Sequence, residues 1–173
     1  MTAISGFLIY FGSTSDRDLE GDYFNAQTDF DLTSRRELSL YFEHGMDSVI
    51  GRRRIGRGLI TPQREGLWID AQAVPELPAR IWNSLMAMAH EGELGFSSGA
   101  PAHLVEREEG WIKRWPLIDA SLTATPAEPR CIANVNPAKA LSARAERLQR
   151  DYVHHLRAIN ETRLWLLEKA HAY

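Results

Sequence analysis

The segment GRGLITPQREGLWIDAQAV, residues 56–74, contains two short apolar runs separated by residues typical of turns. The runs GRGLIT (56–61) and GLWIDAQAV (66–74) include the β-branched and aromatic side chains that favour strands. Pro62 and the stretch Arg64-Glu65-Gly66 between them are typical of a hairpin connection. The segment therefore predicts two antiparallel strands joined by a tight turn.

Further strand patterns occur on both sides of this hairpin, and one helical pattern follows it. The other predicted strands are residues 3–11, 36–42, 94–99, 103–107, 111–115 and 117–125, with Glu109-Gly110 as a turn. Between about 76 and 91 the apolar residues recur at helical spacing; Pro78 suits the first turn of a helix and Gly92 suits its end. Past Pro137 the composition shifts to Ala, Leu and Arg and predicts a long helix.

These elements predict an α+β fold that is mainly β, with a small closed or strongly bent β-barrel, flanking helices and a long C-terminal helix. With 173 residues, the chain is long enough for one compact domain and an appendage. We therefore expect a body over residues 1–137, with its helix at about 76–91, and a helical extension over residues 138–173.

Composition and charge narrow the classes of function. Hydrophobic residues make up 44% and charged residues 25% of the chain, which is typical of globular proteins. No stretch approaches the roughly 20 apolar residues of a membrane span, and the N-terminus lacks the basic region of a secretory signal, so we expect an intracellular protein without a membrane partner. The body carries net charge −6 and the extension +3, which argues against nucleic acid and for protein partners.

Metal and phosphate motifs are incomplete. The acidic run Asp16-x-Asp18-x-Glu20 begins like a calcium loop, but Gln27 stands where the bidentate glutamate belongs. Residues 51–58 have the glycine spacing of a phosphate-binding loop but lack its lysine and hydroxyl. The six histidines show no zinc-ligand spacing, and Cys131 is the single cysteine. We therefore expect no metal and no cofactor.

Three polar residues stand in positions that suit catalysis, although each also fits a structural role. His44 follows an aromatic strand and precedes a glycine, where a cleft can open at the end of a sheet, or where a surface histidine can lie. Ser97 lies among small residues, either as a nucleophile or in a polar turn. Asp119 interrupts an apolar strand and needs a donor, either a histidine N–H or an arginine.

Read in order, five segments resemble the prohead (capsid maturation) serine proteases of tailed bacteriophages, which are similar to the herpesvirus assemblin proteases. The segments are GFLIYFGSTSDRDLEGD (6–22), LSLYFEHGMD (38–47), IGRGLITPQREGLWIDA (55–71), LGFSSG (94–99) and LIDASLTATPAEP (117–129). The resemblance implies a herpesvirus-protease-like barrel and a serine protease domain over residues 1–137. One departure is that the family usually has a glutamate where Asp119 stands.

The resemblance also implies the site and the biology. His44, Ser97 and Asp119 would form the catalytic group, with Ser98 as an alternative nucleophile and His103 as an alternative third member; Gly99 and Arg57 would support the oxyanion. The expected function is cleavage of the scaffolding protein or the scaffold-like segment of the capsid protein, with self-cleavage, inside an immature procapsid in the host cytoplasm. A homo-oligomer is also possible. The alternative is a non-catalytic capsid-assembly or scaffolding module on the same barrel.

Overall fold

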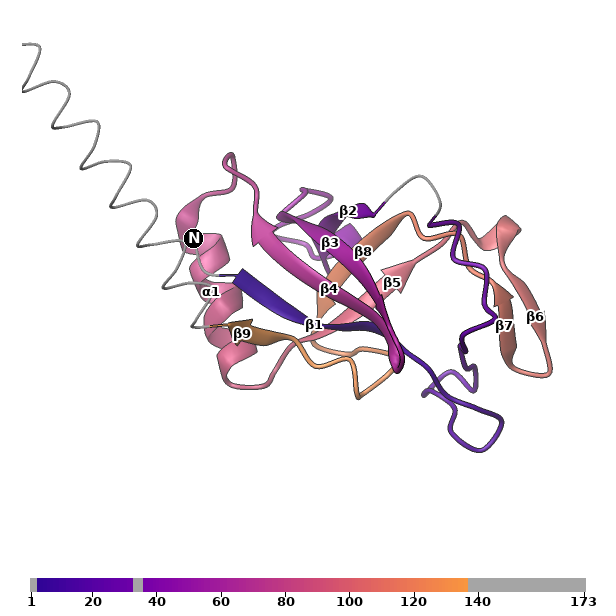
Figure 1. Cartoon of the computed structure of the whole chain (residues 1–173). Coiled ribbons are helices and arrows are strands. Elements are labelled where there is room, and N and C mark those ends of the chain that lie inside the picture. The colour runs from indigo at the N-terminus through magenta and orange to yellow at the C-terminus, as the bar shows by residue number, and fades with distance from the viewer. Residues whose placement is uncertain (1–2, 33–35, 137–173) are drawn as a thin grey trace, which may run out of the picture.

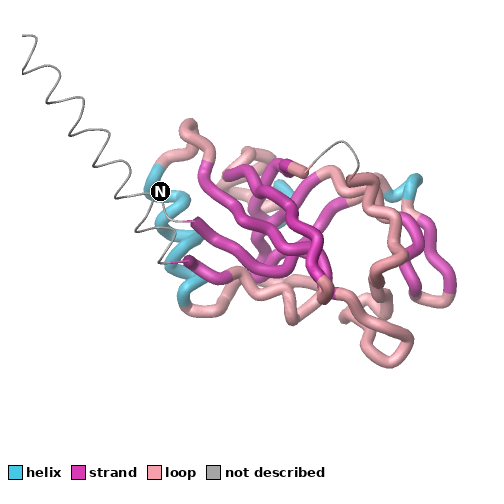
Figure 2. Tube along the Cα trace, in the orientation of Figure 1, coloured by secondary structure: helices cyan, strands magenta, loops and turns pink. Residues whose placement is uncertain are grey.

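The computed structural model describes residues 3–32 and 36–136, which form one curled sheet with a helix at one end and a small hairpin at the other (Figure 1). The elements are β1 (Ala3–Tyr10), β2 (Glu37–Phe42), β3 (Gly56–Gln63), β4 (Gly66–Ala73), α1 (Ala79–His90), β5 (Gly95–Gly99), β6 (Glu106–Glu108), β7 (Trp111–Arg114), β8 (Asp119–Thr123) and β9 (Asn134–Asn136), with 3-10 turns at Glu43–Gly45 and Ala102–Leu104. Among the regular elements of the described residues, strands predominate over helix, as the tube in Figure 2 shows. The prediction of a mainly β fold is confirmed.

The main sheet has seven strands in the order β5-β8-β2-β3-β4-β1-β9. Its neighbouring strands are antiparallel except for β2 and β8, which run parallel. In the β3–β4 hairpin Gln63 pairs with Gly66, so that Arg64 and Glu65 form a two-residue turn. The hairpin predicted from residues 56–74 is therefore confirmed.

The sheet curls until its two edges come close together. The segment that leads into β9 bonds to the start of β5: the Phe96 N–H donates to the Cys131 carbonyl at 2.7 Å, and the Ala133 N–H donates to the Leu94 carbonyl at 3.0 Å. Apolar side chains from both halves of the curled sheet fill the enclosed space and are almost completely buried; they include Ile4, Leu8, Leu38, Leu40, Ile60, Ile69, Phe96 and Leu122. This burial supplies the main driving force for the curled shape.

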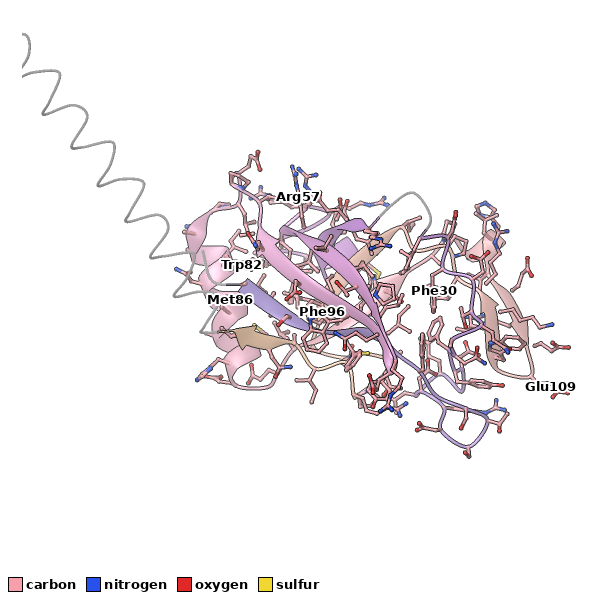
Figure 3. The ribbon with its side chains drawn as sticks, viewed as in Figure 1. Phe30, Arg57, Trp82, Met86, Phe96 and Glu109 are labelled. Atoms are coloured by element: carbon pink, nitrogen blue, oxygen red, sulfur yellow. The ribbon has the colours of Figure 1, made fainter. Side chains whose placement is uncertain are left out.

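Helix α1 closes one end of the curled sheet. It buries Trp82, Leu85, Met86 and Ala89, a stripe at helical spacing, and Figure 3 labels Trp82 and Met86 on it. The helix begins directly after Pro78, and Gly92 follows its end with φ of 78°, a conformation that glycine adopts without steric cost. The helix predicted at about 76–91 is therefore confirmed, three residues shorter at its start.

Two predictions need correction. Residues 103–107 were expected to form a strand, but a 3-10 turn occupies Ala102–Leu104 because the Leu104 N–H donates to the Pro101 carbonyl at 2.9 Å. The following β6 is a short exposed strand that pairs with β7 outside the main sheet. In place of several flanking helices, the described residues contain a single α-helix. The predicted helix over residues 138–173 lies outside the part of the chain that the structure describes.

Candidate active site

Strand β8 lies between β5 and β2, and it brings the three candidate residues onto adjoining elements. On one side Ser97 of β5 pairs with Ser121 and Gly99 pairs with Asp119. On the other side β2 runs parallel to β8 and leads directly into the turn that carries His44. Since paired residues project from the same face of a sheet, Ser97, Asp119 and Ser121 share one face.

His44 lies in a left-handed turn at the end of β2. Glu43, His44 and Gly45 have φ of 47°, 53° and 76°, three consecutive positive values. A non-glycine residue pays roughly 1–3 kcal/mol for such a backbone, so surrounding contacts must hold it in place. The turn presents the imidazole at the surface of the sheet, with 30% of the side chain exposed. Strained backbone of this kind often occurs at functional sites.

The imidazole of His44 faces the carboxylate of Asp119. The Nδ1 atom of His44 lies 3.7 Å from Oδ1 of Asp119, longer than a hydrogen bond and within the range of an ion pair once the imidazole is protonated. Oδ1 is shielded from solvent and has no hydrogen-bond partner among the described residues. A buried carboxylate oxygen without a donor is costly, so a small movement of the imidazole toward it would be favourable.

Gly99 lets this carboxylate lie where it does. A Cβ atom on Gly99 would overlap Oδ1 of Asp119 and would come within 2.9 Å of its Cγ. A glycine opposite Asp119 is therefore a packing requirement of the site. This role differs from the oxyanion support that the resemblance implies for Gly99, and the two roles are compatible.

The two neighbouring serines differ in their surroundings. The Ser98 hydroxyl accepts a hydrogen bond from Nε1 of Trp115 at 3.1 Å. Ser97 projects from the opposite face of β5, on the side of Asp119. A cavity of about 190 Å³ reaches His44, Ser97 and Ser98. The pairing register thus favours Ser97 over Ser98 as the partner of the His44 and Asp119 pair.

The structure places the other two candidates elsewhere. His103 is exposed in the 3-10 turn after β5 and does not line the cavity that reaches Ser97. Arg57 lies on β3, half exposed, with Nη1 3.6 Å from a carboxylate oxygen of Glu37, and it lines a different hollow. Figure 3 labels Arg57 near the top of that view, away from Glu109. Arg57 pairs with Ser39, which pairs with Asp119, so Arg57 lies two strands from Asp119 on the same face of the sheet. Within the described part of the chain, neither Arg57 nor His103 forms a hydrogen bond or ion pair with His44.

The cavity beside Ser97 has an apolar floor and a charged rim. Its apolar lining is Leu8, Ile9, Phe24, Phe96, Ile112 and Trp115. Its acidic lining is Asp16, Asp18, Glu20, Asp22 and Glu128, beside two arginines that pair with members of this group. Within residues 3–32 and 36–136, no group of three or more His, Cys, Asp or Glu side chains is placed to hold a metal ion. An apolar lining with a few polar and charged groups is typical of a binding site.

Arg130 fixes part of that rim. Its guanidinium donates to Glu128 and to Asp16 and lies 4.4 Å from the centre of the Tyr10 ring. The hydrogen bonds that Arg130 donates to the Glu128 carboxylate are the main cause that raises the pKa of Arg130 above its ordinary value. Because Asp16 belongs to the acidic loop, this interaction ties the loop to the segment after β8.

The surroundings of Cys131 indicate whether its thiol could act as a nucleophile. Its side chain is completely buried, and burial raises the pKa of the thiol to about 12. We therefore expect iodoacetamide at neutral pH to leave Cys131 of the folded protein unmodified and any enzymatic activity unchanged, because only the thiolate reacts. Intact-mass measurement with and without denaturant checks this expectation. Rapid modification of the folded protein with loss of activity would contradict it and would favour a cysteine nucleophile.

Sequence reasoning gave no role to three residues that contact the candidate site. The Ser121 hydroxyl accepts a hydrogen bond from the main-chain N–H of His44. The Glu43 carboxylate accepts a hydrogen bond from the hydroxyl of Thr123, the last residue of β8. Nε1 of Trp115 donates a hydrogen bond to the Ser98 hydroxyl. The alternation along residues 115–123 places Ser121 on the same face as Asp119 and was the available signal. Nothing in the local sequence indicated that Glu43 would turn back to β8.

Comparisons with known proteins show a structural likeness without a sequence match. No protein-family model matches the chain, and no curated protein matches it. Among solved structures, the chain is similar to a KSHV protease determined in complex with a hexapeptide phosphonate inhibitor, at 13% sequence identity and a TM-score of 0.48. The alignment covers 76% of this chain and 63% of that protease, less than two thirds of its length.

The described helix is too short and too polar to cross a membrane.

Proposed function

We propose that this chain is a serine endopeptidase in which Ser97 is the nucleophile, His44 the general base and Asp119 the residue that orients the imidazole. The observation that carries the proposal is the juxtaposition of His44 Nδ1 and the otherwise unpartnered Oδ1 of Asp119, 3.7 Å apart, beside a strand that presents Ser97 on the same face. Catalytic hydrogen bonds are often long in a protein without its substrate and shorten in the reacting complex.

The chemistry follows from these roles. The Ser97 hydroxyl attacks the scissile carbonyl carbon and passes its proton to Nε2 of His44. Asp119 holds the proton on Nδ1 and stabilises the imidazolium that forms. His44 then gives its proton to the leaving amine, and water attacks the acyl-enzyme with His44 again as base. Backbone N–H groups near Gly99 would donate hydrogen bonds to the carbonyl oxygen and stabilise the negative charge that develops on it. No metal or cofactor enters any step.

The resemblance of five segments to phage prohead proteases supports a substrate assignment. We infer that the substrates are the scaffolding protein or the scaffold-like segment of the capsid protein, together with the chain itself, inside an immature procapsid in the host cytoplasm. Capsid and scaffolding proteins would then be the partners of the chain, together with further copies of the chain in a homo-oligomer. The fold alone does not determine this biology, since one fold supports many functions.

Two assays test the proposal. Incubation of the purified protein with the cognate capsid precursor is expected to give discrete fragments, identified by mass spectrometry, and the Ser97→Ala variant is expected to give none. Diisopropyl fluorophosphate should add one phosphoryl group to Ser97: the Ser97 oxygen bonds to phosphorus, fluoride leaves and His44 takes the hydroxyl proton. Absence of both fragments and label in the folded wild type would overturn the proposal.

The second candidate is a non-catalytic capsid-assembly or scaffolding module. The observation that favours it is the 3.7 Å separation between His44 and Asp119, which is too long for a hydrogen bond. Such a module would bind the capsid precursor without producing fragments and would leave Ser97 unlabelled. Co-sedimentation with the precursor, run beside the cleavage assay, distinguishes the two functions.

A further inference from the structure

The left-handed turn that carries His44 is attached to β8 by three hydrogen bonds. The main-chain N–H of His44 donates to the Ser121 hydroxyl at 2.8 Å. The carboxylate of the preceding residue, Glu43, accepts from the Thr123 hydroxyl and from the Ala124 main-chain N–H, each at 2.8 Å. A fourth bond, from the Met46 N–H to the Glu43 carbonyl at 2.8 Å, closes the turn itself.

Ser121 is well suited to hold this turn in place. Its side chain is completely buried, and its hydroxyl can donate to the Leu122 carbonyl at 3.1 Å or to the Tyr41 carbonyl at 3.4 Å. With its proton used by either carbonyl, the hydroxyl oxygen accepts from the His44 N–H. Without this acceptor, the His44 N–H would lose its partner in a partly buried place, which is costly.

Strand β8 and the residue that follows it supply every part of the arrangement. Asp119 faces the His44 imidazole, Ser121 binds the His44 main chain, and Thr123 with Ala124 binds the Glu43 side chain. Residues 119, 121 and 123 alternate along β8 and so lie on one face. The last residue of β2, Phe42, pairs with Leu122, so the turn begins directly beside this face. The position of the imidazole relative to Asp119 is thus set by β8 through backbone and side chain together.

We propose that Ser121 and Glu43 are positioning residues: they hold the strained turn at 43–45 so that the His44 imidazole stays between Asp119 and Ser97. This inference rests on the proposed function. Neither residue touches the reacting atoms. Their contribution is the orientation of the base, and an error of about 1 Å in the position of a catalytic group can lower a rate by about 100-fold.

The experiment measures the rate at which diisopropyl fluorophosphate labels Ser97, by intact mass and peptide mapping, in four variants. Ser121→Ala removes the acceptor for the His44 N–H and is expected to slow labelling by about 10- to 100-fold. Ser5→Ala is the matched control, because Ser5 is a buried serine on β1 that pairs with Asp70 and does not line the cavity. The control is expected to label within about twofold of the wild type if positioning, and not general stability, is what matters.

Glu43 provides the second pair of variants. Glu43→Ala loses both bonds to β8 and is expected to slow labelling by about tenfold or more. Glu43→Gln keeps the shape: its amide oxygen can accept from Ala124 and its amide N–H can donate to the Thr123 hydroxyl. Rescue by glutamine supports a positioning role, since a role for the negative charge itself would be lost in both variants. This pair remains informative if Ser121→Ala fails to fold.

Hydrogen exchange supplies a readout that does not depend on chemistry at Ser97. The His44 amide is expected to exchange at least about tenfold faster in Ser121→Ala, while amides of the β8 ladder keep their protection. Folded wild-type protein that gives neither fragments of the capsid precursor nor label at Ser97 would overturn the proposed function. Labelled wild type, with Ser121→Ala and Glu43→Ala labelled at the same rate and the His44 amide unchanged, would overturn the positioning inference alone.

Discussion

The Ser97→Ala variant is expected to fold normally and to lose cleavage of the capsid precursor, with a fall in kcat on the order of 10⁶-fold. That is the size of effect produced when a serine nucleophile is removed from an enzyme of this type. The side chain lies on an edge strand of the sheet and is only partly buried, so the loss of its hydroxyl should change stability little. His44→Ala should give a loss of similar size, because the two residues act as one unit. Circular dichroism and a thermal melt establish that both variants fold.

Ser98→Ala is the control for Ser97→Ala. Its hydroxyl accepts the Trp115 Nε1 hydrogen bond, so the change leaves the indole donor without that partner and costs about 1 kcal/mol of stability. Activity should stay within about tenfold of the wild type, since the hydroxyl that attacks the substrate is still present. The opposite pattern, with Ser98→Ala inactive and Ser97→Ala active, would move the nucleophile by one residue.

The sequence predicted the elements whose pattern is local. The β3–β4 hairpin and α1 were predicted nearly at their observed bounds, because turn residues and helical spacing act over a few residues. The turn at Glu109-Gly110 was also predicted: Gly110 adopts its φ of 87° without steric cost, whereas the φ of 52° at Glu109 is one that non-glycine residues rarely adopt. The local sequence pattern was sufficient to predict an element wherever one hydrogen-bonded turn, or one pair of neighbouring strands, determined its structure.

Other features depend on contacts between distant segments. Strand β9 is three residues long and contains two asparagines, so nothing in its pattern marked it as a strand; its pairing with β1 creates it. The left-handed conformation of Glu43 and His44 was equally hidden, since the sequence shows a glycine only at Gly45. Bonds from β8, some eighty residues later, stabilise that turn. The residues of the candidate site could be named from sequence, but the contacts that hold them could not.

Strand alternation nevertheless anticipated one long-range relation. Placing Asp119 and Ser121 on a single face of one strand required only the period of two along residues 115–123. The structure adds the neighbours of that face: Ser97 on one side and the His44 turn on the other. Neither the parallel pairing of β2 with β8 nor its register follows from local pattern, since both depend on how the whole sheet curls.

The Asp119→Asn variant is expected to lower kcat by about 10⁴-fold while the protein remains folded. The amide can donate a hydrogen bond to Nδ1 of His44, which favours the wrong tautomer and leaves Nε2 protonated and unable to act as base. Asp119→Glu is the informative counterpart. One more methylene could close the 3.7 Å separation to Nδ1, so this variant should retain activity within about tenfold of the wild type. For both variants, the rate of peptide cleavage and the rate at which diisopropyl fluorophosphate labels Ser97 are measured.

Gly99→Ala tests the same geometry from the other strand. The added Cβ would overlap the Asp119 carboxylate, so either the carboxylate moves away from His44 or β5 shifts relative to β8. The first movement lowers kcat without a large change in the thermal melt, and the second lowers both. Alanine has the smallest side chain that contains a Cβ atom, and even this Cβ would overlap the carboxylate. Glycine is therefore the residue at position 99 that permits Asp119 to remain beside the imidazole. If Asp119→Asn and Gly99→Ala both retain wild-type rates while Ser97→Ala is inactive, the third catalytic member must lie elsewhere, and the distance between His44 and Asp119 has no part in the mechanism.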